Sequence, residues 1–181
     1  MAQPYGAYHR LSRGFTIALV VLLLVAMVGI SPPAFASIHT YHEQPGQTTF
    51  RSRQSLRDQR DLAWQATLFK RYRDGHAPVL YLRLVGFPGQ IATDPAQALQ
   101  IKTGTLAEWV APFALDVSTQ RLPPNVGQYQ VGQVFEHFQK AVPLTLVVPL
   151  EHGDTARLLV APFIVQEWLE LNRLTPADAA A

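Results

Sequence analysis

The sequence contains no cysteine. This excludes disulfides, thiol catalysis, thiol redox chemistry and cysteine-based metal sites, so the stability of the fold has to come from packing. The sequence also lacks a Gly-x-Ser-x-Gly elbow, a phosphate-binding glycine loop, a His-Glu-x-x-His pair and a dinucleotide fingerprint. These absences do not exclude an enzyme. They favour a binding or assembly role, and we expect no cofactor.

The chain has no excess of basic residues once the first 36 residues are set aside. The whole chain has a formal net charge of +2, and both extra charges are Arg10 and Arg13. The remaining chain has no basic excess to neutralise phosphates, so we expect no nucleic-acid partner. The charge is uneven, because residues 51–83 have a local net charge of +5 and residues 108–178 one of −4. The two blocks either face each other in the fold or give the protein a dipolar surface that steers a charged partner.

Long apolar runs are rare too, and the longest, residues 17–30, lies close to the amino terminus. It has 14 residues, which suits the apolar region of a secretory signal and is short of the roughly 20 needed to cross a bilayer. Arg10 and Arg13 precede it without any acidic residue, as in the basic region of such a signal. No two arginines are adjacent there, which favours a Sec-type route over twin-arginine export.

A cleavage site follows the apolar run. Ala34-Phe35-Ala36 supplies the small side chains that signal peptidase accepts, so we expect cleavage between Ala36 and Ser37. The alternative is an uncleaved membrane anchor, because Phe15 and Thr16 lengthen the apolar segment. The sequence therefore predicts a signal peptide over residues 1–36, one globular domain over 37–174 and a flexible tail over 175–181.

The first half of the domain has the alternating pattern of short strands joined by tight turns. Pro45-Gly46 and Asp74-Gly75 are the strongest turn pairs, and Asp-Gly is preferred where central turn residues need positive φ. We expect about six to eight strands, a number that follows from the turn count. The predicted strand segments are 38–43, 48–56, 62–73, 79–85, 98–103, 106–111, 144–148 and 155–160.

Helices are predicted only in the second half. Val131, Val134, Phe135 and Phe138 fall on one helical stripe, which predicts an amphipathic helix within residues 127–141 after a loop over 116–128. A second helix is expected to begin at Pro162, since proline suits the first helical turn. The fold class predicted is α+β, an antiparallel β-meander sheet with one or two covering helices.

His39, His42 and Glu43 form the most metal-like cluster in the sequence. On a strand, however, an odd spacing places the two histidines on opposite faces, where they cannot bind one ion. We therefore expect no metal site.

Arginines form the second candidate site. Arg51 and Arg53 lie two residues apart on one predicted strand, and Arg71 and Arg73 lie two apart on the next, with Lys70 on the opposite side. If the register brings both pairs to one face, the arginines crowd together, and an anionic partner explains such a cluster better than folding does. The expected partner is a protein or an anionic membrane surface. The alternative is a solvated face with neighbouring aspartates.

Two other functions remain open at this point. His152, Asp154 and Glu151 share a turn that could hold a general acid or base, and His76 is the other loop histidine of a small hydrolase-like enzyme. The many apolar strand residues could instead line a cavity for an apolar ligand.

Four stretches of the domain resemble an uncharacterised family of exported cyanobacterial proteins, a domain of unknown function. They are Ile38-His39-Thr40-Tyr41-His42-Glu43, Arg51-Ser52-Arg53-Gln54-Ser55-Leu56-Arg57-Asp58, Trp64-Gln65 with Leu68-Phe69-Lys70-Arg71, and Leu82-Arg83-Leu84-Val85-Gly86-Phe87-Pro88-Gly89. The resemblance implies a cyanobacterial source, and hence a thylakoid lumen or a periplasm as destination. It implies no role for any residue. The leading expectation is a non-enzymatic exported accessory or binding protein.

Overall fold

The structure is a computed structural model that describes residues 38–44, 46–104, 107–115 and 121–179. The described residues form nine strands and two α-helices, and every pair of neighbouring strands is antiparallel. The strands are β1 (His39–Gln44), β2 (Gln47–Arg57), β3 (Ala63–Arg73), β4 (His76–Val85), β5 (Leu99–Thr103), β6 (Glu108–Ala111), β7 (Val126–Gln130), β8 (Leu144–Pro149) and β9 (Thr155–Val160). The helices are α2 (Gly132–Glu136) and α3 (Pro162–Arg173).

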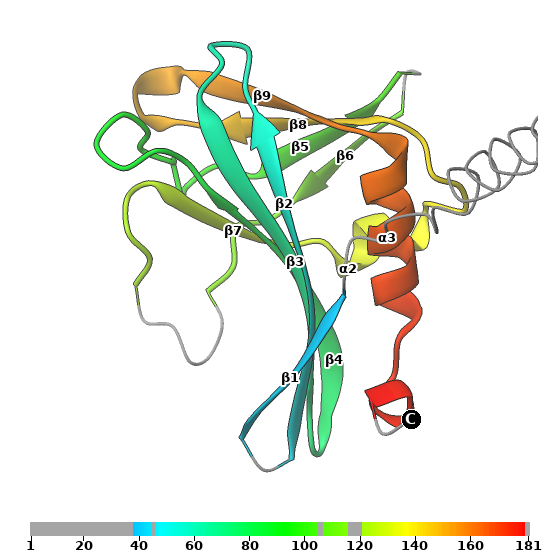
Figure 1. Ribbon diagram of the computed structural model, residues 1–181. Coiled ribbons are helices and arrows are strands. Elements are labelled where there is room, and N and C mark those ends of the chain that lie inside the picture. Colours follow the sequence, from blue (N-terminus) through cyan, green and yellow to red (C-terminus); the bar gives the residue numbers. More distant parts are fainter. Residues whose placement is uncertain (1–37, 45, 105–106, 116–120, 180–181) are drawn as a thin grey trace, which may run out of the picture. The chain divides into compact units, whose positions relative to one another are not determined.

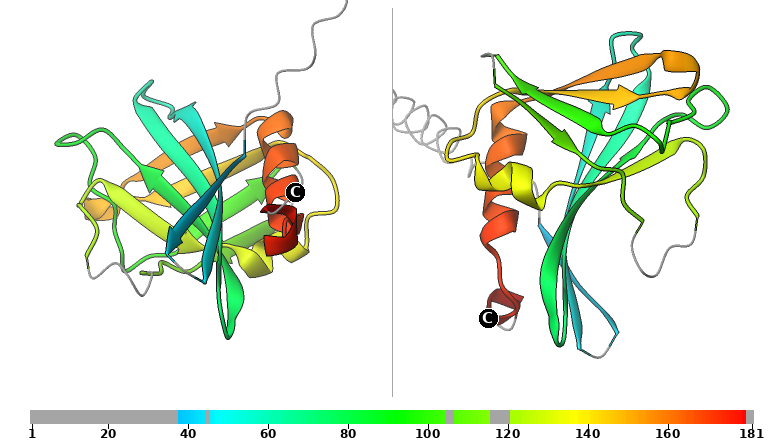
Figure 2. Two further views of the ribbon diagram at one scale, coloured as in Figure 1. Left: turned by 60° about the horizontal axis from the view of Figure 1, so that its bottom comes forward. Right: turned by 180° about the vertical axis from the view of Figure 1, so that it is seen from behind.

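These strands form two sheets. The larger has the order β1-β2-β3-β4-β7, and the smaller has the order β6-β5-β8-β9. Figures 1 and 2 show that the strands of the smaller sheet cross the long strands β2, β3 and β4, and that α3 runs beside the middle of those strands. The α+β class and the antiparallel meander are confirmed, although the strands are divided between two sheets rather than placed in one.

Strand alternation decides which side of the larger sheet becomes the core. On β2 and β3, alternate residues face the smaller sheet or α3, and most of these are apolar, whereas the residues between them face outward. The buried inward side chains from the larger sheet include Phe50, Leu56, Trp64, Leu68, Leu82, Leu84 and Tyr129. Leu99, Ile101, Leu146 and Leu158 face them from the smaller sheet.

The two sheets are joined differently on their two sides. On one side, the chain leaving β6 pairs with β7: Gln130 N–H donates to Pro112 O at 3.0 Å, and Ala114 N–H donates to Gln128 O at 2.9 Å. On the other side, β2 and β9 are adjacent but form no ladder within the described strands. The Gln59 side chain bridges this seam, donating to Thr155 O at 3.0 Å and accepting from Arg157 N–H at 2.7 Å. A side-chain amide thus takes the place of a neighbouring strand on the β9 edge.

Asp58 stabilises the turn between β2 and β3, which also contains Gln59. Its Oδ1 accepts the backbone N–H groups of Arg60 at 2.8 Å and Leu62 at 3.0 Å, and its Oδ2 accepts Trp64 Nε1–H at 3.2 Å. The Asp58 side chain is completely buried. The next carboxylate, Asp61, is exposed and has a positive φ of 61°.

Helix α3 packs against the inner face of β2 and β3. Pro162 occupies its first turn, as predicted, and a stripe that includes Ile164, Val165, Trp168 and Leu171 is buried. At the other end, Lys70 Nζ donates to the carbonyls of Asn172 and Leu174, and Tyr72 Oη donates to Leu174 O at 2.7 Å. A cation at a helix carboxyl end is favourable, because the last carbonyls lack helical partners.

Two predictions about the middle of the chain were wrong. Residues 126–130, assigned in the sequence to a loop and then to a helix, form β7 beside β4. The predicted helix over 127–141 is reduced to the five residues of α2. The apolar stripe is nevertheless buried, because a strand end followed by one helical turn places Val131, Val134 and Phe135 in the core.

Other predicted boundaries agree more closely with the structure. β9 has the predicted limits, and the Asp74-Gly75 pair joins β3 to β4. Of that pair only Gly75 has a positive φ, of 75°, and the ladder shifts between Arg71 and Arg73. This is the pattern of a bulged turn. Among the described helices, none is long and apolar enough to cross a membrane.

Candidate functional site: an arginine-lined sheet face

The β2–β3 register places both predicted arginine pairs on one side of the larger sheet. Arg51 pairs with Phe69, and Thr49 pairs with Arg71, so these four side chains point the same way. Arg53 and Arg73 follow two residues on and share that side. Arg83 on β4 joins them, because it pairs with Thr67 of β3. We call the outward side of β2, β3 and β4, with Arg51, Arg53, Arg71, Arg73 and Arg83, the arginine face.

Aromatic rings lie beneath these guanidinium groups. The guanidinium carbons of Arg71 and Arg83 lie 5.5 and 5.3 Å from the centroid of the Phe69 ring. Phe69 contacts Tyr81 with a centroid distance of 5.3 Å, and it is only 3% exposed although it points outward. The Arg51 guanidinium lies 4.7 Å from the centroid of Tyr41, on β1. Each of these arginines is thus held by a cation–π contact.

Neutral side chains fix the direction of three of the arginines. Arg83 donates from Nε and Nη2 to Gln128 Oε1, at 2.9 and 2.6 Å. Arg73 Nε donates to Gln47 Oε1 at 3.1 Å, and Arg71 Nε donates to Thr49 Oγ1 at 3.5 Å. A guanidinium is planar, so each of these contacts fixes the orientation of the group as well as its position.

Arg53 differs from the other four. It is exposed, and within the described part of the chain it makes no hydrogen bond, ion pair or ring contact. It lies at the end of the row formed by Thr67, Arg83 and Gln128. Arg53 therefore presents a full positive charge to solvent beside an ordered guanidinium.

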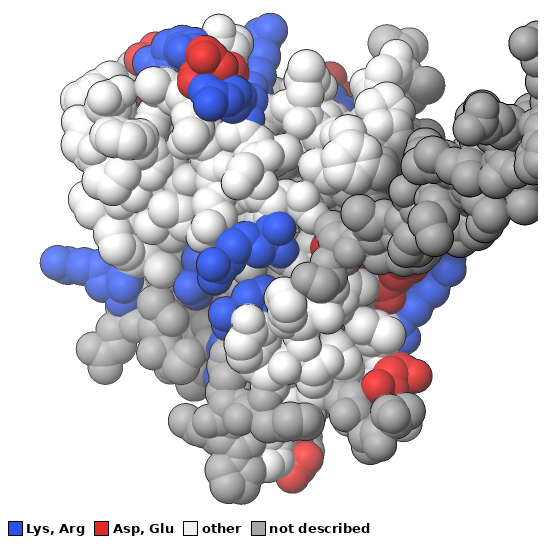
Figure 3. Space-filling view, in the orientation of Figure 1, with Lys and Arg blue, Asp and Glu red and all other residues white. Residues whose placement is uncertain are grey.

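The face is strongly basic. The described outward positions of β2, β3, β4 and β7 include the five arginines and no aspartate or glutamate. In Figure 3, lysine and arginine side chains gather near the middle of the visible surface, over the long strands, whereas at the top basic and acidic side chains adjoin. Guanidinium groups ordered on one side of a sheet are suited to binding carboxylate or phosphate groups by paired hydrogen bonds.

Sequence reasoning identified four of the five arginines and missed Arg83. The same alternation rule would have found it, because Arg83 lies between Leu82 and Leu84, both of which are completely buried. The supporting roles of Phe69, Tyr81 and Gln128 had no signal in the sequence, since they depend on how four strands are registered.

Lys70 lies on the inner face, as predicted, and serves the carboxyl end of α3. His39 is exposed on β1, opposite Arg51, with its ring 6.3 Å from that of Tyr41. His42 and Glu43 belong to β1, but their side chains lie outside the described set, as do Ala36 and Ser37 of the predicted cleavage site. Among the described residues, no group of three or more histidines and carboxylates has the arrangement of a metal site.

The loop histidines of the alternative enzyme function lie in different turns. His76 begins β4 and is exposed, with Nδ1 at 3.0 Å from Asp74 O. His152 is exposed in the 3₁₀ turn Glu151–Gly153, where its φ is 63°. In Figure 1 the start of β4 and the turn between β8 and β9 lie at opposite ends of the domain. The structure therefore does not bring these two histidines together.

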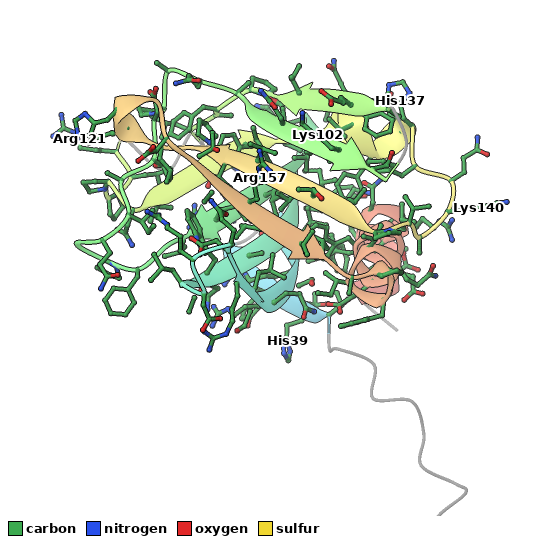
Figure 4. The ribbon with its side chains drawn as sticks, turned by 90° about the horizontal axis from the view of Figure 1, so that it is seen from above. His39, Lys102, Arg121, His137, Lys140 and Arg157 are labelled. Carbon is green, nitrogen blue, oxygen red and sulfur yellow. The ribbon has the colours of Figure 1, made fainter. Side chains whose placement is uncertain are left out.

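A cleft of about 700 Å³ opens beside the segment that joins the two sheets. Its walls are mostly apolar, with Arg121 and Glu151 as the charged members; they include Phe113, Leu115, Leu122, Pro123, Pro124 and Val126. Arg121 extends away from the domain in Figure 4. The cleft shares no residue with the arginine face.

The fold and this face define an antiparallel two-sheet domain with an ordered, arginine-lined surface. The chain belongs to the family described as "Protein of unknown function (DUF3122)", whose model matches residues 36–171. This confirms the predicted membership of an uncharacterised family. No curated protein and no solved structure gives a significant match.

Proposed function

We propose that this protein is a non-enzymatic accessory protein that binds an acidic protein partner through the arginine face. The observation that supports the proposal best is the convergence of five arginines from three strands on one side of the larger sheet. A partner that supplies carboxylates would gain favourable contacts with these charges.

The ordering of the guanidinium groups favours a protein partner over a membrane surface. Phe69, Tyr41 and Gln128 hold Arg51, Arg71 and Arg83 in fixed directions. Fixed donors lose little conformational entropy on binding and select a geometry, which suits carboxylates at defined positions. Attraction to anionic lipids requires only charge near the surface and no such order.

We further propose that the protein works after export, in a thylakoid lumen or a periplasm of a cyanobacterium. The basic segment, the apolar run over residues 17–30 and the Ala34-Phe35-Ala36 site support this location. The match to the family model begins at residue 36, which agrees with a mature domain that starts at the predicted cleavage site.

Arg53→Gln tests the proposed function. A glutamate-rich peptide at low salt is the probe for carboxylate recognition, and its affinity is measured by fluorescence anisotropy. We expect the variant to bind about threefold to tenfold more weakly, because an exposed charge on the binding face is lost. The thermal midpoint should stay within about 1 °C, since Arg53 has no partner among the described residues.

Arg157→Gln is the matched control, because Arg157 is an exposed arginine over the smaller sheet (Figure 4). Arg157→Gln removes one positive charge, as Arg53→Gln does, but at a site away from the arginine face. The affinity for the peptide should therefore not change. Equal weakening by both variants would show a response to net charge alone. Binding to phosphatidylglycerol vesicles without binding to the peptide would assign the face to membranes and refute the proposal.

The cleft favours a second candidate, the carrier of a small apolar ligand. Its volume lies within the range of small-molecule sites, and its walls are mainly apolar. The neutral dye N-phenyl-1-naphthylamine should bind the wild type, and Leu122→Arg should weaken that binding at least about tenfold, because it places a charge in the cleft. The control, Leu159→Arg, changes a leucine that is 73% exposed on β9 and should have no effect. Unchanged dye binding in Leu122→Arg would reject the carrier function for this cleft.

A further inference from the structure

A polar contact lies within the apolar packing between α3 and β2. Glu167, in the middle of α3, is only 7% exposed, and its Oε2 accepts a hydrogen bond from Gln54 Nε2 at 2.8 Å. Its other oxygen, Oε1, is buried and accepts no hydrogen bond from the described residues. Ser52 Oγ, on the same inner side of β2 as Gln54, is also buried without a hydrogen-bond partner in that part of the chain.

The elements around Glu167 supply little positive charge. β2 contributes the neutral side chains of Ser52 and Gln54. β3 contributes Lys70, whose ammonium is bound to carbonyls at the end of α3. The remaining nearby charge on the helix, Glu170, is negative. Among the described residues, Glu167 forms no ion pair that would offset its burial.

These surroundings favour the neutral carboxylic acid. Burial raises the pKa of Glu167. The Ser52 hydroxyl, which lies near the carboxyl group without hydrogen-bond geometry, opposes the rise, the Glu170 charge adds to it, and the hydrogen bond from Gln54 opposes it, with a net upward shift. Protonation removes the cost of burying a charge, and it gives the carboxyl group a proton to donate to a neighbouring acceptor.

We propose that Glu167 makes the attachment of α3 to β2 depend on pH, with the helix held more firmly when this carboxyl group is protonated. The inference does not depend on the proposed function. A carboxyl group with a raised folded-state pKa stabilises most below its unfolded pKa, which is about 4.3. That contribution is lost as pH rises through the folded-state value. Mild acid should therefore tighten α3, and neutral or basic pH should loosen it.

Loosening of α3 would change the surface of the domain substantially. The helix covers inner-face residues of β2 and β3, and Trp168 and Leu171 are 1% and 0% exposed. Ser52 and Gln54 also alternate along β2 with Arg51 and Arg53, so the helix contact and the arginine face share one strand. Protonation of Glu167 would therefore control how firmly α3 covers the inner face of β2 and β3.

Hydrogen exchange measured by mass spectrometry tests this inference on the full chain. Protection of the α3 peptide, corrected for intrinsic rates, should rise severalfold from pH 8 to pH 4, since the contribution of Glu167 is complete only below the unfolded pKa. Protection of β8 serves as the internal reference. In Glu167→Gln the α3 protection should be high at both pH values, because the amide has no charge to bury.

Glu170→Gln is the matched control on the same helix, and it should keep most of the pH response. The same response in Glu167→Gln as in the wild type, or no response in the wild type, would overturn the inference. A carbon-13 titration of the Glu167 carboxyl in the wild type gives a second measurement. A midpoint at or below the ordinary glutamate pKa would also overturn it.

Discussion

Asp58→Asn is expected to lower the free energy of unfolding by about 2–3 kcal/mol, because it leaves a buried donor without an acceptor. Both oxygens of Asp58 accept hydrogen bonds: two backbone N–H groups at Oδ1 and the Trp64 indole N–H at Oδ2. Asparagine keeps the shape but has one acceptor oxygen, so its NH₂ group must face a donor. Urea unfolding followed by tryptophan fluorescence measures the change. The Gln59 bridge to β9 should weaken as well.

Asp61→Asn is the control in the same turn. The Asp61 side chain is 84% exposed and forms an ion pair with the exposed Arg57, and asparagine tolerates its positive φ. The cost should be below about 0.5 kcal/mol, as for other surface pairs. Similar losses in the two variants would show that the turn needs charge in general and that the buried contacts of Asp58 are unimportant.

The Asp58 contribution should also depend on pH, with the opposite sign to that of Glu167. Burial alone would raise the pKa of Asp58, but the bonds from Trp64, Leu62 and Arg60 and the Arg60 charge hold it below its ordinary value. A lowered pKa gives stability that is complete above the unfolded pKa of about 3.9 and is lost as pH falls towards the folded-state value. The gap between wild type and Asp58→Asn should therefore shrink below about pH 4.

Most strands were predictable from the sequence because their signals are local. Alternation over residues 63–73 and 76–85, with the Asp-Gly turn between them, specifies a hairpin whose inward side is mostly apolar. The β7 segment was not predictable in this way. It contains Gly127, which lowers strand propensity, and its assignment depends on pairing with β4 across about 45 residues, as Arg83 and Gln128 show.

The part of the candidate site that follows from strand alternation and from the β2–β3 register was predictable from the sequence. Alternation predicted that Arg51 and Arg53 share one face of their strand, and that Arg71 and Arg73 share one face of theirs. The antiparallel pairing of β2 with β3 places both faces on the same side of the sheet. The contacts of Glu167 could not be derived, because they depend on the rotation and position of α3 against β2. Local patterns determine the faces of each element, and only tertiary packing determines which faces meet.

A close contact within β7 leads to the second large effect. The Tyr129 side chain folds back over Gly127, so a Cβ atom at position 127 would lie 2.6 Å from Tyr129 Oη and 2.9 Å from Cε2. Tyr129 is 0% exposed, and its ring has little room to move. Gly127→Ala is therefore expected to destabilise the fold by about 2 kcal/mol through overpacking. Thermal unfolding followed by circular dichroism measures the loss.

Gly75→Ala and Gly132→Ala help to separate overpacking from backbone effects. Both sites have open space for a Cβ atom, and only Gly75 has a positive φ. Gly132→Ala should be neutral or slightly stabilising, since alanine favours the helix. Gly75→Ala should cost about 1 kcal/mol from backbone strain alone. A loss in Gly127→Ala no larger than the change in Gly132→Ala would show that Tyr129 adjusts freely.

Tyr129→Phe completes a double-mutant cycle with Gly127→Ala. The Tyr129 hydroxyl is buried with no hydrogen-bond partner among the described residues, so its removal deletes a polar group that gains nothing from folding. Tyr129→Phe should be neutral or stabilising by up to about 1 kcal/mol. Because the new Cβ meets the hydroxyl most closely, Gly127→Ala should cost about 1 kcal/mol less in the phenylalanine background. Additive effects, or a marked loss of stability in Tyr129→Phe, would mean that the hydroxyl forms a favourable contact and that the close approach at Gly127 is relieved elsewhere.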